Sequence, residues 1–161
     1  METGVHFRSA RLSGRPPYAG ALVLYGALFG PDRGPARLTV DMQDWARHEV
    51  APWVLSHAGH PVGVAGFRIG FGEDGLELSF HFLPEVSGQG LASEFVQAAM
   101  DHAVAVLRED SFFAFVEADN APSIRILEKA GFVAERRRNG EILMRLNLAT
   151  RQEDRPSDQA G

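Results

Sequence analysis

The stretch SGQGLASEF, Ser87–Phe95, follows an alternating apolar segment and precedes a segment with helical periodicity. Gly88 and Gly90 would let consecutive backbone N–H groups converge on one point, because no Cβ atom stands in the way. The start of the following helix adds unpaired donors and a partial positive charge. The stretch therefore predicts a cradle for a phosphate or pyrophosphate, and a plain turn is the alternative. No lysine follows Gly90 and no third glycine completes a dinucleotide fingerprint, so neither of those nucleotide motifs is present.

The segment before the cradle, LELSFHF from Leu76 to Phe82, alternates between apolar and polar residues. This period of two is typical of a strand with one buried face. Glu77 and His81 fall on the polar face, where each is a candidate for proton transfer. The alternatives are a solvated strand residue for Glu77 and a hydrogen-bonded structural imidazole for His81.

The rest of the chain alternates between strand and helix signals, which predicts an α/β (α+β) fold with a mixed central sheet and helices on both faces. We expect strands at 7–14, 53–57, 61–70, 76–82, 112–118, 132–138 and 141–148, and helices at 16–30, 39–50, 90–107 and 121–130. Thr39 or Asp41 would cap the second helix, after a loop at 31–37. The pair Asn139-Gly140 predicts the turn of the last hairpin.

The composition limits the function classes. The chain has 161 residues, no cysteine and a formal net charge of -5. A disulfide framework and a Cys nucleophile are excluded, and a nucleic-acid surface is not expected. The first twelve residues lack the apolar core of a signal peptide, and the longest apolar stretch is too short for a membrane span, which favours a cytoplasmic protein without membrane contact. We expect one domain over 1–148 and a disordered polar tail over 149–161.

A second motif, NAPSIRILEKAGF from Asn120 to Phe132, follows the next strand. Asn120 and Ser123 stand at the entry of the predicted helix. Helix capping accounts for both, and presentation of polar groups to a ligand is the functional alternative.

Together the two motifs resemble those of the GNAT superfamily of N-acetyltransferases. SGQGLAS resembles its acyl-CoA-binding motif, and NAPSIRILEKAGF resembles its Asn-x-x-Ser/Ala…Glu-Lys-x-Gly-Phe segment. The opening SARLSGRP is similar to that of the branch that modifies ribosomal proteins (the RimJ/RimL type), with Ala10 and Gly14 as departures. Ser87 replaces the usual Gln or Arg. Leu127 stands where many members carry a Tyr that protonates the leaving thiolate.

The resemblance implies a twisted sheet of about seven strands whose two central parallel strands part in a V that receives acetyl-CoA. No metal is implied, and homodimers occur among such proteins. The positions that correspond to cofactor contacts are Phe82, Leu83, Ser87, Gly88, Gln89, Gly90, Leu91, Ala92, Ser93, Asn120 and Ser123.

The implied reaction is direct transfer of the acetyl group from the thioester to a primary amine, either a protein N-terminus or a small-molecule amine. Glu77 would act as base, with His81 as a relay, and Ser123 could donate a proton to the leaving thiolate. The acceptor would be selected by the region from about residue 17 to residue 50 and by the closing hairpin. The alternative is a non-catalytic module that binds or senses acyl-CoA.

Overall fold

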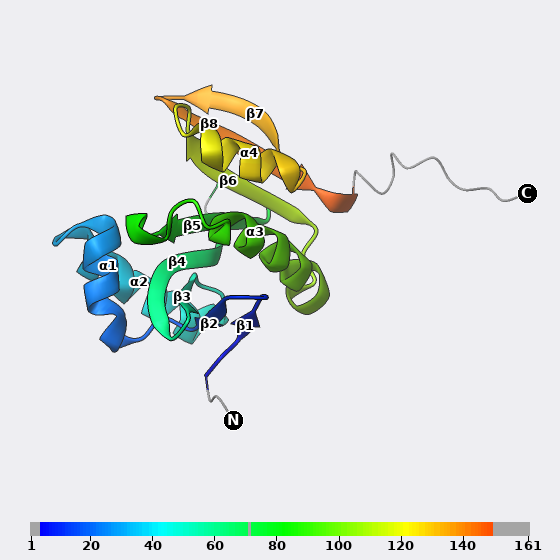
Figure 1. The fold of residues 1–161 in the computed structure, drawn as a ribbon. Coiled ribbons are helices and arrows are strands. Elements are labelled where there is room, and N and C mark those ends of the chain that lie inside the picture. Colours follow the sequence, from blue (N-terminus) through cyan, green and yellow to red (C-terminus); the bar gives the residue numbers. More distant parts are fainter. Residues whose placement is uncertain (1–3, 71, 150–161) are drawn as a thin grey trace, which may run out of the picture.

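Eight strands form one mixed sheet in the order β1-β2-β3-β4-β5-β6-β8-β7 (Figure 1). The structure, a computed structural model, describes residues 4–70 and 72–149. The strands are β1 (Phe7–Arg8), β2 (Ser13–Arg15), β3 (Trp53–His57), β4 (His60–Ile69), β5 (Leu76–Phe82), β6 (Ser111–Glu117), β7 (Val133–Arg138) and β8 (Glu141–Asn147). The helices are α1 (Leu22–Phe29), α2 (Arg33–His48), α3 (Leu91–His102) and α4 (Ala121–Lys129), with short helical turns at Ala19–Ala21, Pro84–Val86 and Ala103–Leu107.

The expected strand at 7–14 is two short strands, which raises the number of strands from about seven to eight. β1 pairs antiparallel with β2, with Phe7 opposite Gly14. The Ser9 amide donates to the Leu12 carbonyl at 2.9 Å, so the chain reverses between the two strands. The other expected strands form at nearly the expected positions, and the Asn139-Gly140 turn is confirmed with positive φ at both residues.

Helices cover both faces of the sheet, as expected (Figure 1). On one face α1 and α2 contribute Leu24, Tyr25 and Leu38 to an apolar cluster with Val54 and Val64 of the sheet. On the other face α3 and α4 belong to the main core, which contains these buried residues among others: Leu78, Phe95, Val96, Ala99, Phe112 and Leu127. The main core thus lies directly beneath the helix that follows the glycine cradle.

The second helix begins earlier than predicted, because the expected loop at 31–37 is mostly helical. α2 starts at Arg33 and takes Pro35 into its first turn, where a missing N–H is tolerated. Gly34 allows α2 to lie directly against α1, since an added Cβ atom would stand 2.7 Å from the Tyr25 carbonyl carbon. The Gly-Pro pair at 34–35 is also typical of a loop, so the sequence alone does not reveal that two helices meet at Gly34.

The predicted caps Thr39 and Asp41 are therefore wrong, because both lie inside α2. The Thr39 hydroxyl donates to the Pro35 carbonyl at 3.1 Å, which is one turn back along the helix. Asp41 is completely buried and accepts hydrogen bonds from Tyr25 and Arg68.

The predicted helix at 90–107 is α-helical only to His102, after which Ala103–Leu107 forms a π-helical segment. Within the described residues, no helix is both long and apolar enough to cross a membrane. Apart from Ala149, the predicted tail lies outside the residues that the structure describes.

Candidate active site

The two central parallel strands part soon after they begin to pair. β5 and β6 are each seven residues long, and they pair only at Leu76 with Phe112 and at Glu77 with Phe113. Beyond Glu77 the edge of β5 that faces β6 has no strand partner among the described residues. The predicted V-shaped split is therefore confirmed.

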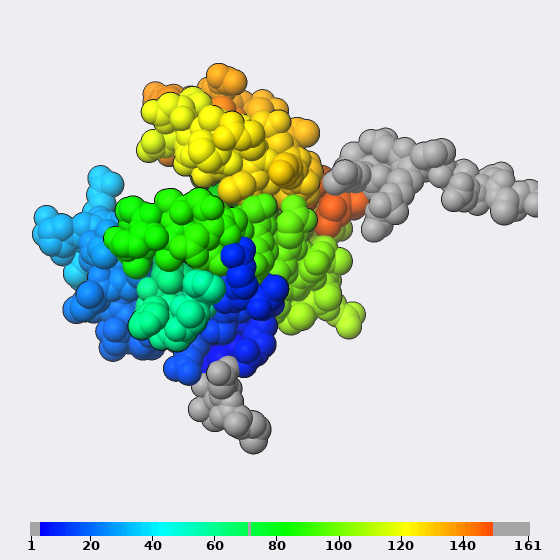
Figure 2. Space-filling model, viewed as in Figure 1, coloured from blue at the N-terminus to red at the C-terminus, as the bar shows by residue number. Residues whose placement is uncertain are grey.

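A cavity of about 370 Å³ occupies the split. Its lining comes from both strands and from the start of α4, and it includes Ser79, His81, Phe115, Asn120 and Ser123. In Figure 2 the surface is indented between the green residues, which include β5, and the yellow residues, which include α4. The split thus opens to the surface next to the end of β5.

The glycine cradle, formed by residues 87–90 and the first turn of α3, follows β5 in the chain. Gly88 and Gly90 have φ values of 79° and 76°, and residues 87–90 are all exposed. Along α3, the Glu94 amide is the first that donates a backbone hydrogen bond, and its acceptor is the Gly90 carbonyl. No hydrogen bond recorded for the described residues uses the amides from Gly88 to Ser93. An added Cβ atom at Gly88 would meet nothing within 4 Å, so the space beside this glycine is open.

The other residues predicted to contact the cofactor differ in how far their side chains are exposed. Phe82 and Leu83 are half-buried at the end of β5, and Leu83 donates its amide to Val62 on the side away from the split. Leu91 is 2% exposed and packs in the core, so only its backbone amide can serve a ligand. Ala92 and Ser93 are half-buried in the first turn of α3.

Arg11 is a residue of this site that the sequence did not predict. Its Nε atom donates to Glu94 Oε1 at 2.7 Å, and one terminal nitrogen donates to the Gln89 carbonyl at 2.9 Å. Its other terminal nitrogen lies 3.6 Å from the point where a Cβ atom would stand if Gly90 were replaced by a larger residue. A guanidinium group from the β1–β2 connection therefore stands beside the cradle, where Ser87 supplies no charge. The SARL segment contained Arg11, but nothing in its spacing indicated a contact so far along the chain.

Asn120 and Ser123 meet at the start of α4. The Ser123 amide donates to Asn120 Oδ1 at 3.3 Å, so Asn120 caps the helix. Both residues also line the cavity. Capping and a ligand contact are thus compatible at Asn120, because a cap uses one oxygen of the amide and leaves its nitrogen available.

Glu77, Ser79 and His81 share the face of β5 that α1 and α2 cover. In the register with β4, Glu77 lies opposite Arg68 and His81 lies opposite Val64. Burial raises the pKa of Glu77, against the opposing effect of the positive charges of Arg68 and Arg37. A carboxyl group with a raised pKa holds its proton more readily, which suits a base that must accept one.

His81 is unsuited to carry a charge at neutral pH. Burial among protein atoms, together with the positive charges of Arg37 and Arg68, lowers its pKa to about 4. Solvent reaches the imidazole from the cavity, but its ring also packs edge-on against Phe29 at 4.9 Å. His81 is therefore a neutral imidazole that can relay a proton or hold a hydrogen bond.

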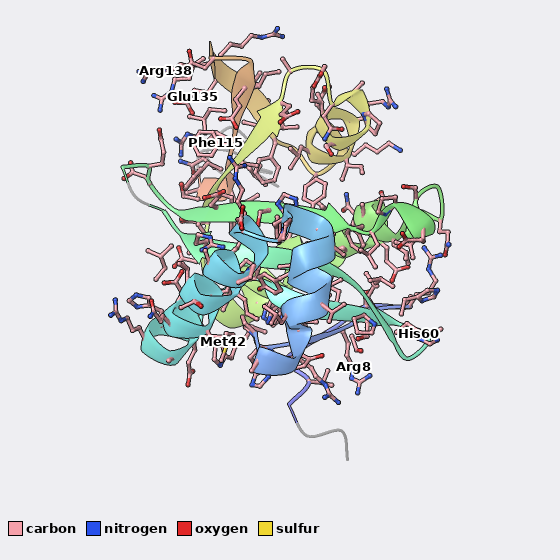
Figure 3. The ribbon with its side chains drawn as sticks, turned by 90° about the vertical axis from the view of Figure 1, so that its left-hand side faces the viewer. Arg8, Met42, His60, Phe115, Glu135 and Arg138 are labelled. Carbon is pink, nitrogen blue, oxygen red and sulfur yellow. The ribbon has the colours of Figure 1, made fainter. Side chains whose placement is uncertain are left out.

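Among the cavity residues that were not predicted, three bear on its chemistry or its access. Ser79 has a buried hydroxyl with no hydrogen-bond partner among the described residues, and its place between Glu77 and His81 could have indicated it. Phe115 is 47% exposed although it lies in a central strand, and Figure 3 shows it between β5 and the part of the molecule that contains β7 and β8. Glu141 also lines the cavity, and its charge contributes to the raised pKa of Glu77. Nothing in the apolar run FFAF distinguishes Phe115 from its buried neighbours.

The side of the site near α1 and α2 is built on a buried polar network. The Tyr25 hydroxyl donates to Asp41 Oδ2 at 2.6 Å, and Arg68 donates to Asp41 Oδ1 at 2.5 Å and to Asp44 at 3.3 Å. Burial and the adjacent carboxylate raise the pKa of Tyr25. Asp41 and Tyr25 are therefore structural, and neither is free to bind an acceptor amine. No group of three or more potential metal ligands occurs among the residues described.

Comparisons with known proteins agree with this geometry. None of the curated proteins matches the chain. Solved structures that match include an acetyltransferase from Agrobacterium tumefaciens, 18% identical with a TM-score of 0.75 over 91% of this chain and 97% of that one. A spermidine N-acetyltransferase SpeG mutant from Vibrio cholerae is 16% identical, with a TM-score of 0.71 over 91% and 98% of the two chains.

A third match is the microcin C7 self-immunity acetyltransferase MccE in complex with acetyl-CoA and AMP. It is 12% identical, with a TM-score of 0.71 over 91% of this chain and 97% of that one. At these identities the three structures establish the shared fold. The family model described as an acetyltransferase (GNAT) domain matches residues 27–133, which include the parted strands, the glycine cradle and α4. The chain therefore belongs to the GNAT acetyltransferase family.

Proposed function

We propose that this protein moves an acetyl group directly from the thioester of acetyl-CoA to a primary amine. The observation that carries the proposal is the exposed glycine cradle at the mouth of the parted strands, whose amides from Gly88 to Ser93 donate to no acceptor within residues 4–70 and 72–149. Membership of the acetyltransferase family supports the same reaction class.

The residues present fit a long ligand with a pyrophosphate group and amide groups. The amides of the cradle and the start of α3 would hold the pyrophosphate, since a helix N-terminus favours negative charge. Arg11 would add a positive charge at the same place. The unpaired edge of β5 near Phe82 offers backbone groups to an extended arm, in the manner of strand addition. When bound, acetyl-CoA would supply the activated acetyl group.

The side chains at the split would handle the protons. An amine must lose its proton before it can attack, and a lysine-like amine with a pKa near ~10.4 is almost fully protonated at neutral pH. Glu77 is not among the residues that line the cavity, so it would take this proton through water or through Ser79 and neutral His81, which do line it. Ser123 would donate to the leaving sulfur, because Leu127, at the position of the usual Tyr, has no proton to give.

The acceptor amine is bound, on this proposal, between the α1–α2 layer and the start of β8. Phe115, Glu117 and Glu141 line that side of the cavity. A protein N-terminus and a small-molecule amine both satisfy this arrangement, and the similarity of fold to a spermidine N-acetyltransferase favours including polyamines in the test. The RimJ/RimL-type branch, the cytoplasmic location and a homodimer stay predictions.

The test combines calorimetry with a turnover assay. Coenzyme A should bind with measurable heat, and thiol release from acetyl-CoA should accelerate in the presence of at least one amine from a panel of N-terminal peptides, polyamines and aminoglycosides. A titration without heat would contradict the proposed cradle. Binding without turnover on any amine would favour the non-catalytic alternative.

A further inference from the structure

Arg68 in β4 stands directly opposite Glu77 in β5, but the two side chains do not form an ion pair. They are partners in the antiparallel register, so both side chains leave the same face of the sheet. Opposite charges at such positions ordinarily attract each other across the strands. Among the described residues, however, the hydrogen bonds and ion pairs of Arg68 go to Asp41 and Asp44. These contacts hold the guanidinium group away from Glu77.

Asp41 holds Arg68 because its carboxylate is completely buried. One terminal nitrogen of Arg68 lies 2.5 Å from Asp41 Oδ1, and the side chain of Asp41 is 0% exposed. Loss of Arg68 would leave this carboxylate without a cation inside the protein, which is strongly unfavourable. Glu77 is only half-buried, so water stabilises part of its charge when no cation pairs with it. The ion pair with Asp41 is therefore favoured over one with Glu77.

Tyr25 and Asp44 fix the direction of this ion pair. The Tyr25 hydroxyl donates to Asp41 Oδ2 at 2.6 Å, which leaves Oδ1 to face Arg68. The other terminal nitrogen of Arg68 donates to Asp44 Oδ2 at 3.3 Å. Both acceptors belong to α2, and Figure 3 shows α1 and α2 in front of the sheet. The guanidinium group thus donates to the helix layer and not to β5.

The other charged groups around Glu77 form no ion pair with it in the part of the chain that the structure describes. Arg37 of α2 is the second cation that acts on this carboxyl group, and its guanidinium lies 4.5 Å from the centre of the Phe29 ring. Glu141 of β8 adds a negative charge, and His81 is neutral near pH 7 because its pKa is about 4. Burial therefore outweighs the two cations and raises the pKa of Glu77.

We infer that Asp41 is a positioning residue for the proposed base, because it holds Arg68 in an ion pair that excludes Glu77. On the proposed function Glu77 accepts the proton of the amine, and the role of Asp41 depends on that assignment. A carboxylate paired with a guanidinium group is a weaker base, since the cation stabilises its charged form. Asp41 does not line the cavity between the parted strands. It acts on the reaction through Arg68.

NMR of the Glu77 carboxyl group measures this effect without turnover. The protein is labelled with isotopic glutamate and titrated with acid, and the signal that is missing from Glu77→Gln belongs to Glu77. In Asp41→Asn a neutral amide attracts Arg68 less, so the guanidinium can turn towards Glu77. The pKa of Glu77 should then fall by about one pH unit or more. An unchanged pKa in the folded variant would overturn the inference.

A double variant shows whether Asp41 acts through Arg68. Removal of the charge of Asp41 by itself also favours the charged form of Glu77, without any movement of Arg68. Addition of Arg68→Met to Asp41→Asn removes the released cation and replaces a buried ion pair by two uncharged side chains, which a fold tolerates well. The pKa of Glu77 should return to its original value or exceed it. A pKa that stays low in the double variant would overturn the inference.

Two single variants complete the set. Asp44→Asn changes a side chain that is 28% exposed and removes the longer contact of Arg68, so the pKa of Glu77 should fall by less than in Asp41→Asn. If Asp41→Asn does not fold, an unchanged pKa in Asp44→Asn overturns the inference. Tyr25→Phe is the control, because it disturbs Asp41 but leaves Arg68 on Oδ1, and the pKa of Glu77 should be unchanged. A fall as large as in Asp41→Asn would overturn the inference.

The pH profile of kcat connects this arrangement with the reaction. In Asp41→Asn the acid limb should move to lower pH by as much as the pKa of Glu77 falls, and the plateau should drop several-fold because the base is weaker. A role of Asp41 in folding alone would lower the melting temperature and leave the limb in place, which would overturn the inference. If the unsubstituted protein acetylates no amine, the proposed function fails, and the NMR titrations still decide whether Asp41 holds Arg68 away from Glu77.

Discussion

At the scale of single residues, Glu77 is the proposed catalytic base, and its environment disfavours the charged form of its carboxyl group. The residue is half-buried where the two strands part, and its pKa is raised. A group whose pKa is raised on folding stabilises the fold below its unfolded pKa of about 4.3, and this contribution is lost as the pH rises through the folded value. At neutral pH the charged form of Glu77 therefore lowers the free energy of unfolding.

The substitution Glu77→Gln should separate these two effects. We expect kcat to fall about 10²-fold or more with a lysine-like amine, and less with an α-amino group whose pKa is near ~8. The melting temperature near neutral pH should rise, and the difference should disappear below about pH 4. Steady-state kinetics and thermal unfolding measure both. An unchanged kcat would mean that Glu77 is not the base of the reaction.

His81 should affect the pH dependence of stability more than that of activity. Its pKa of about 4 means that the folded protein leaves it neutral while the unfolded chain binds a proton below about pH 6.5. The free energy of unfolding should therefore fall as the pH drops from about 6.5 towards 4. In His81→Gln the loss of stability between about pH 7 and pH 5, measured by urea unfolding, should be smaller. A rate profile that loses a limb near pH 6.5 in this variant would contradict the neutral assignment.

At the scale of elements, the loop before α3 owes its proposed function to backbone geometry. Gly88 has a φ of 79° with open space around a potential Cβ atom, and Gly140, in the last hairpin, has a φ of 80° with the same open space. An alanine at either position would be strained by about 1 kcal/mol. Gly140→Ala is therefore a matched control for Gly88→Ala.

Both glycine variants should lose about 1 kcal/mol of unfolding free energy in denaturant titrations. Gly88→Ala alone should weaken coenzyme A binding, by about tenfold, because its methyl group would occupy open space in which the pyrophosphate is proposed to lie. Equal affinities for coenzyme A in the two variants would remove the cradle from the binding site.

The start of α4 allows the cap and the ligand contact to be distinguished. Asn120→Ala removes the oxygen that accepts from Ser123, which should destabilise the fold by about 1 kcal/mol. Asn120→Asp keeps that oxygen and so should preserve the melting temperature, but it removes the amide nitrogen. If the nitrogen contacts the cofactor, calorimetry should show weaker coenzyme A binding in both variants. Normal binding in the Asp variant would leave Asn120 with the cap alone.

At the scale of the whole molecule, the N-terminal hairpin is attached to the helix that carries the cradle. Ser9 and Arg11 both donate to the carboxylate of Glu94, at 2.5 Å from the Ser9 hydroxyl and 2.8 Å from the Arg11 amide. Burial alone would raise the pKa of Glu94, but the hydrogen bonds from Ser9 and Arg11 outweigh it and lower the pKa. The contribution of Glu94 to stability is therefore present above the unfolded pKa and is lost as the pH falls through the folded one.

Glu94→Gln should lower the free energy of unfolding by about 1 kcal/mol at neutral pH, with a smaller loss below about pH 4. Coenzyme A binding should weaken in parallel, since Arg11 would no longer be held beside Gln89. Glu135→Gln is the control, because Glu135 is 40% exposed in its ion pair with Arg145, and exposed pairs contribute about 0–1 kcal/mol. Equal effects of the two substitutions would mean that the hairpin does not support the cradle.

Local patterns were sufficient for much of the fold. The period of two in β5, the Asn139-Gly140 turn and the glycines before α3 predicted a strand, a hairpin and a cradle, because each depends on residues that are neighbours in the chain. The resemblance of two motifs then predicted the parted sheet and the family, and both are confirmed. The early start of α2 was missed, since a packed Gly34 and a loop glycine are identical in sequence.

The sequence by itself determined the order of the elements, the cradle and the polar face that carries Glu77. Only the tertiary structure decided which residues from distant parts of the chain join them. Arg11 donates to Gln89, and Asp41 accepts from Tyr25 and Arg68. Phe115 is exposed where the strands part. The physical reason is that backbone preferences and side-chain periodicity act over a few residues, whereas burial and ion pairing depend on which surfaces the packed sheet and helices bring together.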